Sequence, residues 1–359
     1  MKTIHAFIFD LGKGGAQGVF VTLVNYLNDN GYRIETVLQT SENAVHMEEL
    51  AEGIHITSLE VRSAKEMLPK LIRYFKNNHI ELALAFSPEI AVNLYLAKIA
   101  LNCKTHIIGR NINTLSVEFK YTDSFFRRNV TKNLIKLFYK KLDYIIAQSK
   151  GMAGDLVNHF GVSDEKIVVI NNPLAKKYED EIENLPVLKR EDYILYVGRL
   201  ERQKGLNYLL KAFSKIKSTD IKLFIVGSGS LREELVKMAK GYSINDRVEF
   251  IDFTSNVVEY YRKARLTVLT SLYEGFPNVL IESISCGTPV VAFDMPSGAN
   301  EIINAENGII VEYLNEEKLV CALDYGLDKE WNYRDIKETA KNYKEALIVQ
   351  KYRAIFEEI

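Results

Sequence analysis

The sequence has few cysteines, and its histidines lack a metal-binding spacing. Cys103, Cys286 and Cys321 are the only cysteines, and they lie far apart and outside any CxxC or CxxH pattern. The six histidines include no pair at the spacing of a metal site. These absences disfavour structural disulfides and a zinc site, and they suit a reducing compartment.

The chain also lacks long apolar runs and a net charge. No stretch approaches the roughly 18 uncharged apolar residues of a membrane-spanning helix. Residues 3–11 are apolar but run directly into Gly12-Lys13-Gly14-Gly15, which predicts a first strand and its loop and not a signal peptide. The formal net charge of -1 offers no basic excess for a general nucleic-acid binder. We expect a cytoplasmic protein without nucleic-acid partners.

The sequence does contain a regular alternation of short β-branched or aromatic runs and longer amphipathic stretches. Such alternation is typical of βαβ units, which build a parallel sheet covered by helices on both faces. Helical patterns such as 18–30 and 64–77 lie between the strands. The predicted strands are 4–9, 33–38, 54–58, 82–86, 105–109, 144–148 and 167–170, followed by 194–197, 222–226, 248–250, 266–269, 289–292 and 309–311.

The alternation stops once and then starts again, which predicts two domains. Asn171-Asn172-Pro173 ends the first series, and the stretch up to Asp192 is charged and contains Pro186, as a linker should be. We expect an α/β protein of two tandem Rossmann-like domains. The expected bounds are 1–173 for the N-terminal domain, 174–192 for the linker, 193–342 for the C-terminal domain and about 343–359 for a last helix that packs back on the first domain.

The loops that leave the carboxyl ends of the strands are the candidates for chemistry, because ligands of open parallel sheets bind there. Two such domains facing one another would form a cleft, which is a favoured position for a small ligand. The candidate loops are 12–15, 198–205, 227–230, 253–255 and 271–278.

Two glutamates separated by seven residues form the most specific motif. Glu274 and Glu282 bound the run Glu-Gly-Phe-Pro-Asn-Val-Leu-Ile-Glu, between one predicted strand and the Cys-Gly-Thr-Pro before the next. The first would lie on a loop, and the second inside a helix starting near Pro277 whose free N–H groups and dipole favour a phosphate. Taken alone, two such acids are more often solvated surface residues. The strand–loop–helix–strand context instead favours contact with different parts of one extended ligand.

A second motif places two cations at the carboxyl end of a strand. The run from Tyr196 ends its strand in Gly198-Arg199, continues to Lys204 and opens the next helix at Gly205. An arginine can bind a diphosphate through two parallel hydrogen bonds, and a lysine adds a compact charge. The alternative is a solvated basic turn.

Glycine-rich loops follow two further strands. The loop from Gly12 to Gly18 would let a backbone approach an anion closely, although a plain tight turn is the alternative. It is not a P-loop, because no Gly-Lys-Ser/Thr follows. Gly227-Ser228-Gly229-Ser230 matches only part of a dinucleotide fingerprint, because Arg232 occupies its sixth position.

The Glu-x7-Glu segment resembles the hallmark of the retaining glycosyltransferases of family 4, of the bacterial surface-polysaccharide type, which have the two-Rossmann GT-B fold. The resemblance extends over nearly the whole chain. It implies that Glu274 contacts hydroxyls of the donor sugar, that Glu282 binds the ribose hydroxyls, and that Arg199 and Lys204 hold the donor diphosphate. It also assigns to donor binding Gly14, Gly15, Gly198, Gly227, Phe253, Thr254, Gly275, Phe276, Asn278 and Val279.

One position departs from the common pattern of the family. Many members carry a histidine after the strand equivalent to 105–109, whereas here the strand ends in Arg110-Asn111, as in one branch of the family. The resemblance places Arg110 and Asn111 on the acceptor side. We expect His106, inside the strand, to be structural.

Seven lysines and arginines lie between Lys120 and Lys141, interleaved with aromatic and aliphatic residues. From Ser124 these residues recur at near-helical spacing, which could lay a helix on an anionic membrane surface. The alternative is an ordinary amphipathic helix with a solvated basic face. On the membrane interpretation, the acceptor is a lipid-linked saccharide and the protein works at the inner face of the cytoplasmic membrane.

We therefore predict a retaining hexosyltransferase that moves a hexose or N-acetylhexosamine from a nucleotide diphosphate sugar, with UDP favoured by analogy, to a saccharide in cell-surface polysaccharide synthesis. Neither a cofactor nor a metal is expected, because no Asp-x-Asp is present to hold a metal-bridged diphosphate. Two alternatives stay open: a nucleotide-sugar epimerase on the same fold, and a non-catalytic nucleotide-binding partner subunit. A nicotinamide oxidoreductase is a more distant third.

Overall fold

The structure of the protein is a computed structural model that describes residues 2–12, 14–42, 44–183 and 189–359. Its contacts divide the chain into two compact units. Unit 1 comprises residues 1–175 and 345–359, and unit 2 comprises residues 176–344. Lys13 of the first glycine loop and residues 184–188 of the predicted linker, including Pro186, lie outside the described residues.

Unit 1 is built on a parallel sheet of seven strands in the order β3-β2-β1-β4-β5-β6-β7. Its strands are β1 (Thr3–Ile8), β2 (Arg33–Leu38), β3 (His55–Ser58), β4 (Leu82–Ala85), β5 (His106–Arg110), β6 (Tyr144–Ala147) and β7 (Ile167–Val169). Its helices are α1 (Gly15–Asp29), α2 (Ala64–Asn77), α3 (Pro88–Leu101), α4 (Leu115–Tyr121), α5 (Lys132–Phe138), α6 (Lys150–Phe160) and α15 (Glu345–Glu358).

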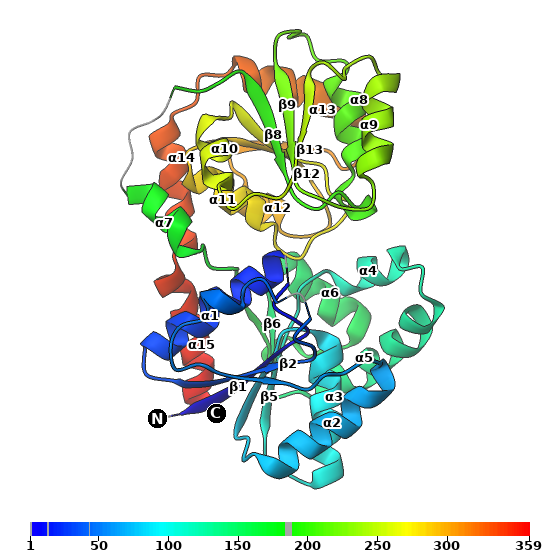
Figure 1. The fold of residues 1–359 in the computed structure, drawn as a ribbon, viewed down its shortest axis with the longest axis vertical. Coiled ribbons are helices and arrows are strands. Elements are labelled where there is room, and N and C mark those ends of the chain that lie inside the picture. Colours follow the sequence, from blue (N-terminus) through cyan, green and yellow to red (C-terminus); the bar gives the residue numbers. More distant parts are fainter. Residues whose placement is uncertain (1, 13, 43, 184–188) are drawn as a thin grey trace. The chain divides into compact units, whose positions relative to one another are not determined.

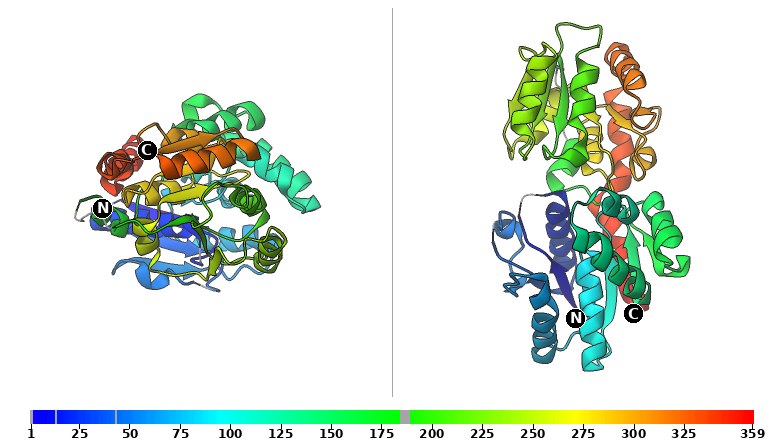
Figure 2. Two further views of the ribbon diagram at one scale, coloured as in Figure 1. Left: turned by 90° about the horizontal axis from the view of Figure 1, so that it is seen from above. Right: turned by 90° about the vertical axis from the view of Figure 1, so that its right-hand side faces the viewer.

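Helices cover both faces of this sheet (Figures 1 and 2). Successive side chains of a strand point to opposite faces. Ile4 and Ile8 of β1 therefore join a core with α1 and α15, whereas Phe7 joins the core formed with α2, α3 and α6.

Unit 2 repeats this plan with a parallel sheet of six strands in the order β10-β9-β8-β11-β12-β13. Its strands are β8 (Tyr193–Val197), β9 (Lys222–Val226), β10 (Val248–Ile251), β11 (Leu266–Leu269), β12 (Val290–Phe293) and β13 (Gly308–Val311). Its helices are α7 (Lys176–Glu183), α8 (Leu206–Phe213), α9 (Arg232–Gly241), α10 (Val257–Lys263), α11 (Asn278–Ser285), α12 (Ala299–Ile302), α13 (Glu316–Asp328) and α14 (Tyr333–Ala340). Every residue of β11 and β12 is buried, as expected for strands covered on both faces.

The predicted fold class is confirmed: each predicted strand matches an observed one within one residue at either end. The strand order reverses at β1, between β2 and β4, and at β8, between β9 and β11. Such a switch point opens a crevice at the carboxyl ends of the strands. The loops after β8 and β11, which carry the two main motifs, therefore leave neighbouring strands of unit 2.

The predicted linker differs from the structure. Residues 176–183 form α7 within unit 2. The ring centroids of Tyr178 and Tyr261 lie 6.2 Å apart, and the Lys337 ammonium donates to the Glu181 carbonyl at 2.6 Å. The buried face of α7 accounts for the difference, because a solvated linker would not bury Tyr178 and Glu181. At the other end of the chain, α15 packs against α1 in unit 1.

Candidate active site

Lys204 and Glu274, one from each main motif, contact each other directly. The Lys204 ammonium donates to Glu274 Oε1 at 2.5 Å, although the residues are 70 positions apart. The Ser271 hydroxyl donates to the same oxygen at 2.7 Å. Both charged side chains are largely buried, at 14% and 10% exposed. The structure thus brings together the two residues that the resemblance assigned to the diphosphate and to the sugar.

Backbone contacts explain how the two motifs meet. Residues Arg202–Lys204 form a 3-10 turn after β8, and this turn is hydrogen-bonded to the loop after β11. The Leu272 N–H donates to the Gln203 carbonyl at 2.7 Å, and the Gln203 side chain donates to the Tyr273 carbonyl at 2.8 Å. The Thr270 hydroxyl donates to the Lys204 carbonyl at 3.2 Å. Gln203 is therefore a site residue that the motif analysis missed.

Gly205 permits this close approach. Its φ of +61° is left-handed, and a β-carbon at this position would lie 2.2 Å from the Thr270 carbonyl oxygen. Any side chain would push the Lys204 turn away from the Glu274 loop.

The Gly275–Asn278 segment leads into α11, whose N-terminus has no side-chain cap and no acid in its first turn. Asn278 and Val279 open the helix, and the ring of Phe276 lies 5.6 Å from the ring of Tyr343. An uncapped helix start without a carboxylate is electrostatically suited to a phosphate.

The loop after β12 supports this segment and was not among the predicted candidate loops. The Ser297 hydroxyl donates to the Gly275 carbonyl at 2.9 Å. Gly298 has a φ of +87°, and a β-carbon there would lie 2.9 Å from Pro277 Cδ. This loop follows the carboxyl end of β12, and that position is the signal from which the sequence could have identified it.

The Gly227–Ser230 loop packs on the loop that carries Arg199. Gly198 and Gly227 have φ values of +153° and +145°, and a β-carbon on Gly227 would lie 1.9 Å from the Gly198 carbonyl oxygen. The glycines are therefore explained by the contact between neighbouring loops, with no need for a nicotinamide. Arg199 is exposed, and its guanidinium donates to the Gln203 side chain at 3.3 Å.

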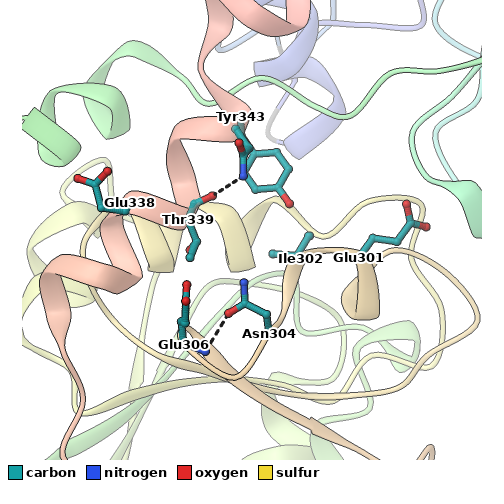
Figure 3. Close-up of a pocket in the computed structure, with 8 residues that line it drawn as sticks. Glu301, Ile302, Asn304, Glu306, Glu338, Thr339 and Tyr343 are labelled. Atoms are coloured by element: carbon teal, nitrogen blue, oxygen red, sulfur yellow. Dashed lines mark hydrogen bonds between the residues drawn. The ribbon is translucent and has the colours of Figure 1, made fainter.

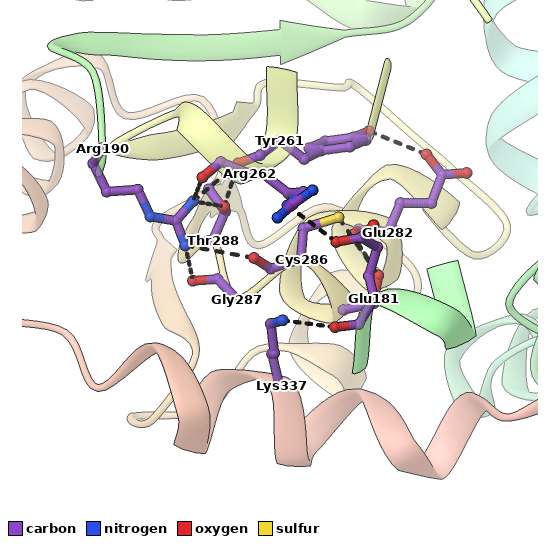
Figure 4. A network of polar contacts seen from close by, with 10 residues as sticks. Glu181, Arg190, Tyr261, Arg262, Glu282, Cys286, Gly287, Thr288 and Lys337 are labelled. Atoms are coloured by element: carbon purple, nitrogen blue, oxygen red, sulfur yellow. Dashed lines mark hydrogen bonds and ion pairs between the residues drawn. The ribbon is translucent and has the colours of Figure 1, made fainter. Parts of the chain in front are cut away.

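Glu282 lies in the second turn of α11 with different partners from those of Glu274. The Tyr261 hydroxyl donates to Glu282 Oε2 at 3.1 Å (Figure 4). Tyr178 of α7 adds a second hydrogen bond to this carboxylate. Burial raises the pKa of Glu282, whereas these two hydrogen bonds oppose that shift. No contact in the described part of the chain joins Glu282 to the Lys204–Glu274 pair, so its role at the ribose stays a prediction.

Arg190 holds the C-terminal ends of α10 and α11, although it belonged to the predicted linker. Its guanidinium donates to the carbonyls of Arg262 at 2.6 Å and Gly287 at 2.8 Å and to the Thr288 hydroxyl at 2.6 Å (Figure 4). It also lies over the Tyr333 ring, 4.4 Å from the centroid. Arg190 thus fixes the far end of the helix that carries Glu282.

Unit 1 presents its glycine loop at the start of α1. Gly14 precedes the helix and Gly15 is its first residue. The Asp10 carboxylate accepts from the Gly12 N–H and from the Gln17 side chain, both at 2.9 Å. Asp10 therefore shapes the loop, and its place between the first strand and the glycines was the signal that the motif analysis did not use.

Arg110 is fully buried in unit 1. Its Nε donates to the Tyr352 hydroxyl of α15 at 3.0 Å, its Nη2 donates to Asn172 Oδ1 at 2.5 Å, and the guanidinium lies 4.7 Å from the centroid of the Phe86 ring. Within the described residues, Arg110 Nη1 and Asn111 Nδ2 have no hydrogen-bond partner. Their predicted place on the acceptor side stays a prediction.

His106, half-exposed on β5, forms an ion pair with Asp143 at 3.5 Å when its ring is protonated.

The residues predicted to contact the nucleobase, Phe253 and Thr254, lie after β10. Phe253 is 52% exposed, and the Thr254 hydroxyl accepts from the Asn256 N–H at 3.1 Å. Neither contact tests a nucleobase site, so these two assignments also stay predictions.

A pocket of unit 2 lies between the segment around α12 and the end of α14 (Figure 3). It contains three glutamates and none of the predicted donor residues, and three carboxylates disfavour a diphosphate. Its lining residues are Glu301, Ile302, Asn304, Glu306, Glu338, Thr339, Asn342 and Tyr343.

Among the described residues, no helix has the length and apolar character needed to cross a membrane. Nor does any group of three or more histidine, cysteine, aspartate or glutamate side chains there have the arrangement of a metal site.

Comparison with known proteins identifies the class to which this two-domain chain belongs, that of the glycosyltransferases. Residues 13–175 match the family model described as Glycosyltransferase Family 4, and residues 177–343 match the one described as Glycosyl transferases group 1. HepE of Anabaena in complex with UDP-glucose has the same fold, with a TM-score of 0.80, 17% identity and 100% of both chains covered.

Two curated relatives come from Campylobacter jejuni. One is an N-acetylgalactosamine-N,N'-diacetylbacillosaminyl-diphospho-undecaprenol 4-alpha-N-acetylgalactosaminyltransferase, 30% identical over 96% of each chain. The other is a GalNAc-alpha-(1->4)-GalNAc-alpha-(1->3)-diNAcBac-PP-undecaprenol alpha-1,4-N-acetyl-D-galactosaminyltransferase, 27% identical over 96% of this chain and 93% of the relative. The chain belongs to glycosyltransferase family 4.

Proposed function

We propose that the protein is a retaining glycosyltransferase that moves a hexose or N-acetylhexosamine from a UDP-sugar to a lipid-linked saccharide in cell-surface polysaccharide synthesis. The undecaprenol-linked saccharides in the names of both Campylobacter relatives support a lipid-linked acceptor. The complex of HepE with UDP-glucose supports a uridine donor. The observation that carries the proposal is the buried ion pair between Lys204, in the turn after β8, and Glu274, on the loop that leads into the start of α11, which has no side-chain cap.

In this proposal unit 2 holds the donor. Arg199, Lys204 and the first N–H groups of α11 bind the diphosphate, Glu274 accepts hydrogen bonds from hydroxyls of the sugar, and Glu282 binds the ribose. Unit 1 contributes Gly14 and Gly15 near the phosphates, and Arg110 and Asn111 act on the acceptor side. That the substrates meet in a cleft between the two domains stays a prediction from the sequence.

The transfer step exchanges one C–O bond at the anomeric carbon for another. The acceptor hydroxyl oxygen attacks this carbon on the face from which UDP departs, so the configuration is retained. The bond between the anomeric carbon and the β-phosphate oxygen breaks, and the hydroxyl proton passes to that phosphate oxygen. Arg199, Lys204 and the helix start stabilise the charge that grows on the leaving diphosphate. The step as proposed needs no metal, no cofactor and no protein base.

We place the reaction at the cytoplasmic face of the membrane that holds the acceptor lipid. The basic stretch from Lys120 to Lys141 is the proposed contact with that membrane.

A donor screen followed by a transfer assay tests the proposal. A true donor binds the native state and raises its melting temperature, so UDP-sugars should raise it more than GDP- or ADP-sugars do. The stabilising donor is then incubated with undecaprenyl-diphosphate-linked saccharides, and NMR of the product should show the same anomeric configuration as the donor. Chelation with EDTA should leave the rate unchanged.

Other outcomes of the same assays would identify the alternatives. A new nucleotide sugar formed from the donor alone would indicate an epimerase. Donor binding with neither hydrolysis nor transfer at any enzyme concentration would indicate a binding subunit. An absorbance change on titration with a nicotinamide cofactor would indicate an oxidoreductase. Each result would contradict the proposed transferase.

A further inference from the structure

Two tyrosines from different helices of unit 2 hold the carboxylate of Glu282. The Tyr261 hydroxyl, from α10, donates to Glu282 Oε2 at 3.1 Å, and the Tyr178 hydroxyl, from α7, donates a second hydrogen bond. The two tyrosine rings meet edge to face, with centroids 6.2 Å apart and planes at 69°. Tyr261 is fully buried and Tyr178 is 4% exposed. The packing of unit 2 therefore fixes where both hydroxyls lie.

Helix α7, which carries Tyr178, is fixed to other helices of unit 2 by charged side chains. Arg262 Nε of α10 pairs with Glu181 Oε2 at 3.2 Å, and the Lys337 ammonium of α14 donates to the Glu181 carbonyl at 2.6 Å (Figure 4). These contacts hold one turn of α7 against α10 and α14. They keep the Tyr178 hydroxyl at the Glu282 carboxylate, which a solvated linker would not do.

The carboxylate of Glu282 lies one helical turn beyond the start of α11. Asn278 opens this helix, and Glu282 follows four residues later. Residues four apart share one face of a helix, and four residues span about 6 Å along its axis. A nucleotide whose phosphates bind the first N–H groups of α11 can therefore reach Glu282 with its ribose.

The two tyrosines also favour the charged form of Glu282. Burial raises the pKa of Glu282, because it disfavours a charge away from water. The hydrogen bonds from Tyr261 and Tyr178 and the charge of Lys177 lower that pKa, because they stabilise the carboxylate. Loss of either hydroxyl would thus leave a carboxyl group that is protonated more readily and less well oriented.

The hydrogen-bonding capacity of the carboxylate limits what else it can bind. An ionised carboxylate only accepts hydrogen bonds, and its two oxygens offer about four lone-pair sites. The two tyrosine hydroxyls use two of these sites, which leaves capacity for two further donors. Neighbouring hydroxyls of one sugar ring form such a pair of donors, and the 2′- and 3′-hydroxyls of a ribose are the pair that a nucleotide offers.

We propose that Tyr178 and Tyr261 are positioning residues that orient the Glu282 carboxylate toward the 2′- and 3′-hydroxyls of the donor ribose. The pair thereby makes the enzyme select ribonucleoside diphosphates over their 2′-deoxy counterparts. A site built to bind a hydroxyl rejects the analogue that lacks it, because a buried acceptor is then left unpaired. The inference rests on the proposed function, in which Glu282 binds the ribose, and adds the residues that orient Glu282.

Isothermal titration with UDP and with 2′-deoxy-UDP tests the proposal. The wild-type protein should bind UDP at least about tenfold more tightly than 2′-deoxy-UDP. Tyr178→Phe and Tyr261→Phe each remove one hydroxyl and keep the ring, and each should reduce this preference to about threefold or less. Because both ligands carry the same diphosphate, the ratio of their affinities reports on the ribose contact. A merely structural role of the tyrosines would leave the ratio unchanged.

Two further variants calibrate the measurement. Tyr193→Phe is the matched control, because it also removes a buried tyrosine hydroxyl of unit 2, which donates to the Tyr260 carbonyl at 2.7 Å from the amino end of β8. It should keep the wild-type preference for UDP even if its melting temperature falls. Glu282→Gln should lose the preference, because its one acceptor oxygen has two lone pairs and the two tyrosines occupy them. A cooperative thermal transition establishes that each variant is folded.

The possible results separate this inference from the proposed function. If folded Tyr178→Phe and Tyr261→Phe keep the wild-type preference while Glu282→Gln loses it, the tyrosines do not position the carboxylate and the inference is overturned. If Glu282→Gln also keeps the preference, the assignment of Glu282 to the ribose fails, and the inference fails with it. The expected loss of preference in a protein that transfers no sugar would support the inference and contradict only the proposed transferase.

Discussion

Glu274→Gln should strengthen the binding of UDP while it abolishes sugar transfer. In the structure, Glu274 accepts from the Lys204 ammonium at 2.5 Å and from the Ser271 hydroxyl at 2.7 Å, and the pair is largely buried. A diphosphate that binds Lys204 must compete with this carboxylate for the ammonium, and the two anions repel one another. The carboxylate becomes useful only when a sugar offers it hydroxyl donors, which UDP lacks at that position.

The geometry sets the size of the effect. Unit charges 4 Å apart interact by about 4 kcal/mol at an effective dielectric constant of 20, and a hydrogen bond to a charged group is worth about 1.5–3 kcal/mol net. Lys204 can donate to the carboxylate and to the diphosphate at the same time, so UDP binding should gain only about 1.4 kcal/mol of this interaction free energy in Glu274→Gln. That gain corresponds to about tenfold tighter binding of UDP. Lys204→Met removes the cation and should weaken UDP binding by roughly 10- to 100-fold. Transfer should fall by roughly 100-fold or more in both variants.

Isothermal titration with UDP at one fixed ionic strength measures the binding, and a transfer assay measures the turnover. Glu234→Gln and Lys237→Met on α9 remove the same charges from exposed positions, so they control for long-range charge effects. The reasoning is refuted if Glu274→Gln weakens UDP binding to the extent that Lys204→Met does. If neither variant changes UDP binding while both controls behave as wild type, the pair lies outside the diphosphate site.

Three further predictions concern the framework of unit 2. Gly227→Ala should lower the free energy of unfolding by at least about 3 kcal/mol in urea denaturation, because its φ is +145° and the new β-carbon would lie 1.9 Å from a backbone oxygen. Gly241→Ala, with open space around it, should cost far less. Arg190→Lys should cost roughly 2–4 kcal/mol, because an ammonium cannot serve as many carbonyls as the guanidinium does, whereas the same change at exposed Arg202 should have little effect. Glu282 has a raised native pKa, so the native state keeps its proton to higher pH than the unfolded chain does. The Glu282 contribution is thus most favourable below the ordinary glutamate pKa of about 4.3 and is lost as pH rises through the raised pKa. In Glu282→Gln the free energy of unfolding, measured by chemical denaturation at a series of pH values, should fall less steeply as pH rises. An unchanged pH dependence would contradict the raised pKa of Glu282.

The fold could be predicted in detail because its signals are local. Strands covered on both faces read as short apolar runs, as in β12, and the glycine-containing loops separate them from the amphipathic helices. The prediction of the linker was wrong because it too relied on a local signal. Lysine and glutamate dominate α7, and the sequence does not reveal that Tyr178 and Glu181 face unit 2.

The sequence predicts the residues of the site that belong to its motifs, but not the residues that hold those motifs in place. The sequence indicates that the loops after β8 and β11 share one edge of a sheet, but the direct contact of Lys204 with Glu274 depends on hydrogen bonds from Gln203 and Thr270. Ser297 was missed because a serine in a loop has no distinctive pattern until the chain segment that it contacts is known. Arg190 was missed because its carbonyl partners come from the ends of two helices far along the chain.

Arg110 shows why the sequence around one residue does not reveal how its side chain is held. Its Nε and Nη2 donate to Tyr352 of the last helix and to Asn172, and its guanidinium lies over the Phe86 ring. Burying a cation is costly unless hydrogen bonds or an anion compensate for the lost water, and Nη1 has no hydrogen-bond partner within the described residues. One of the two hydrogen bonds that orient the Arg110 guanidinium therefore comes from α15, some 240 residues further along the chain. The position of the Arg110 guanidinium at the end of β5 therefore depends on how the C-terminal helix packs, and Arg110→His would remove the two hydrogen bonds that the guanidinium donates to Tyr352 and Asn172.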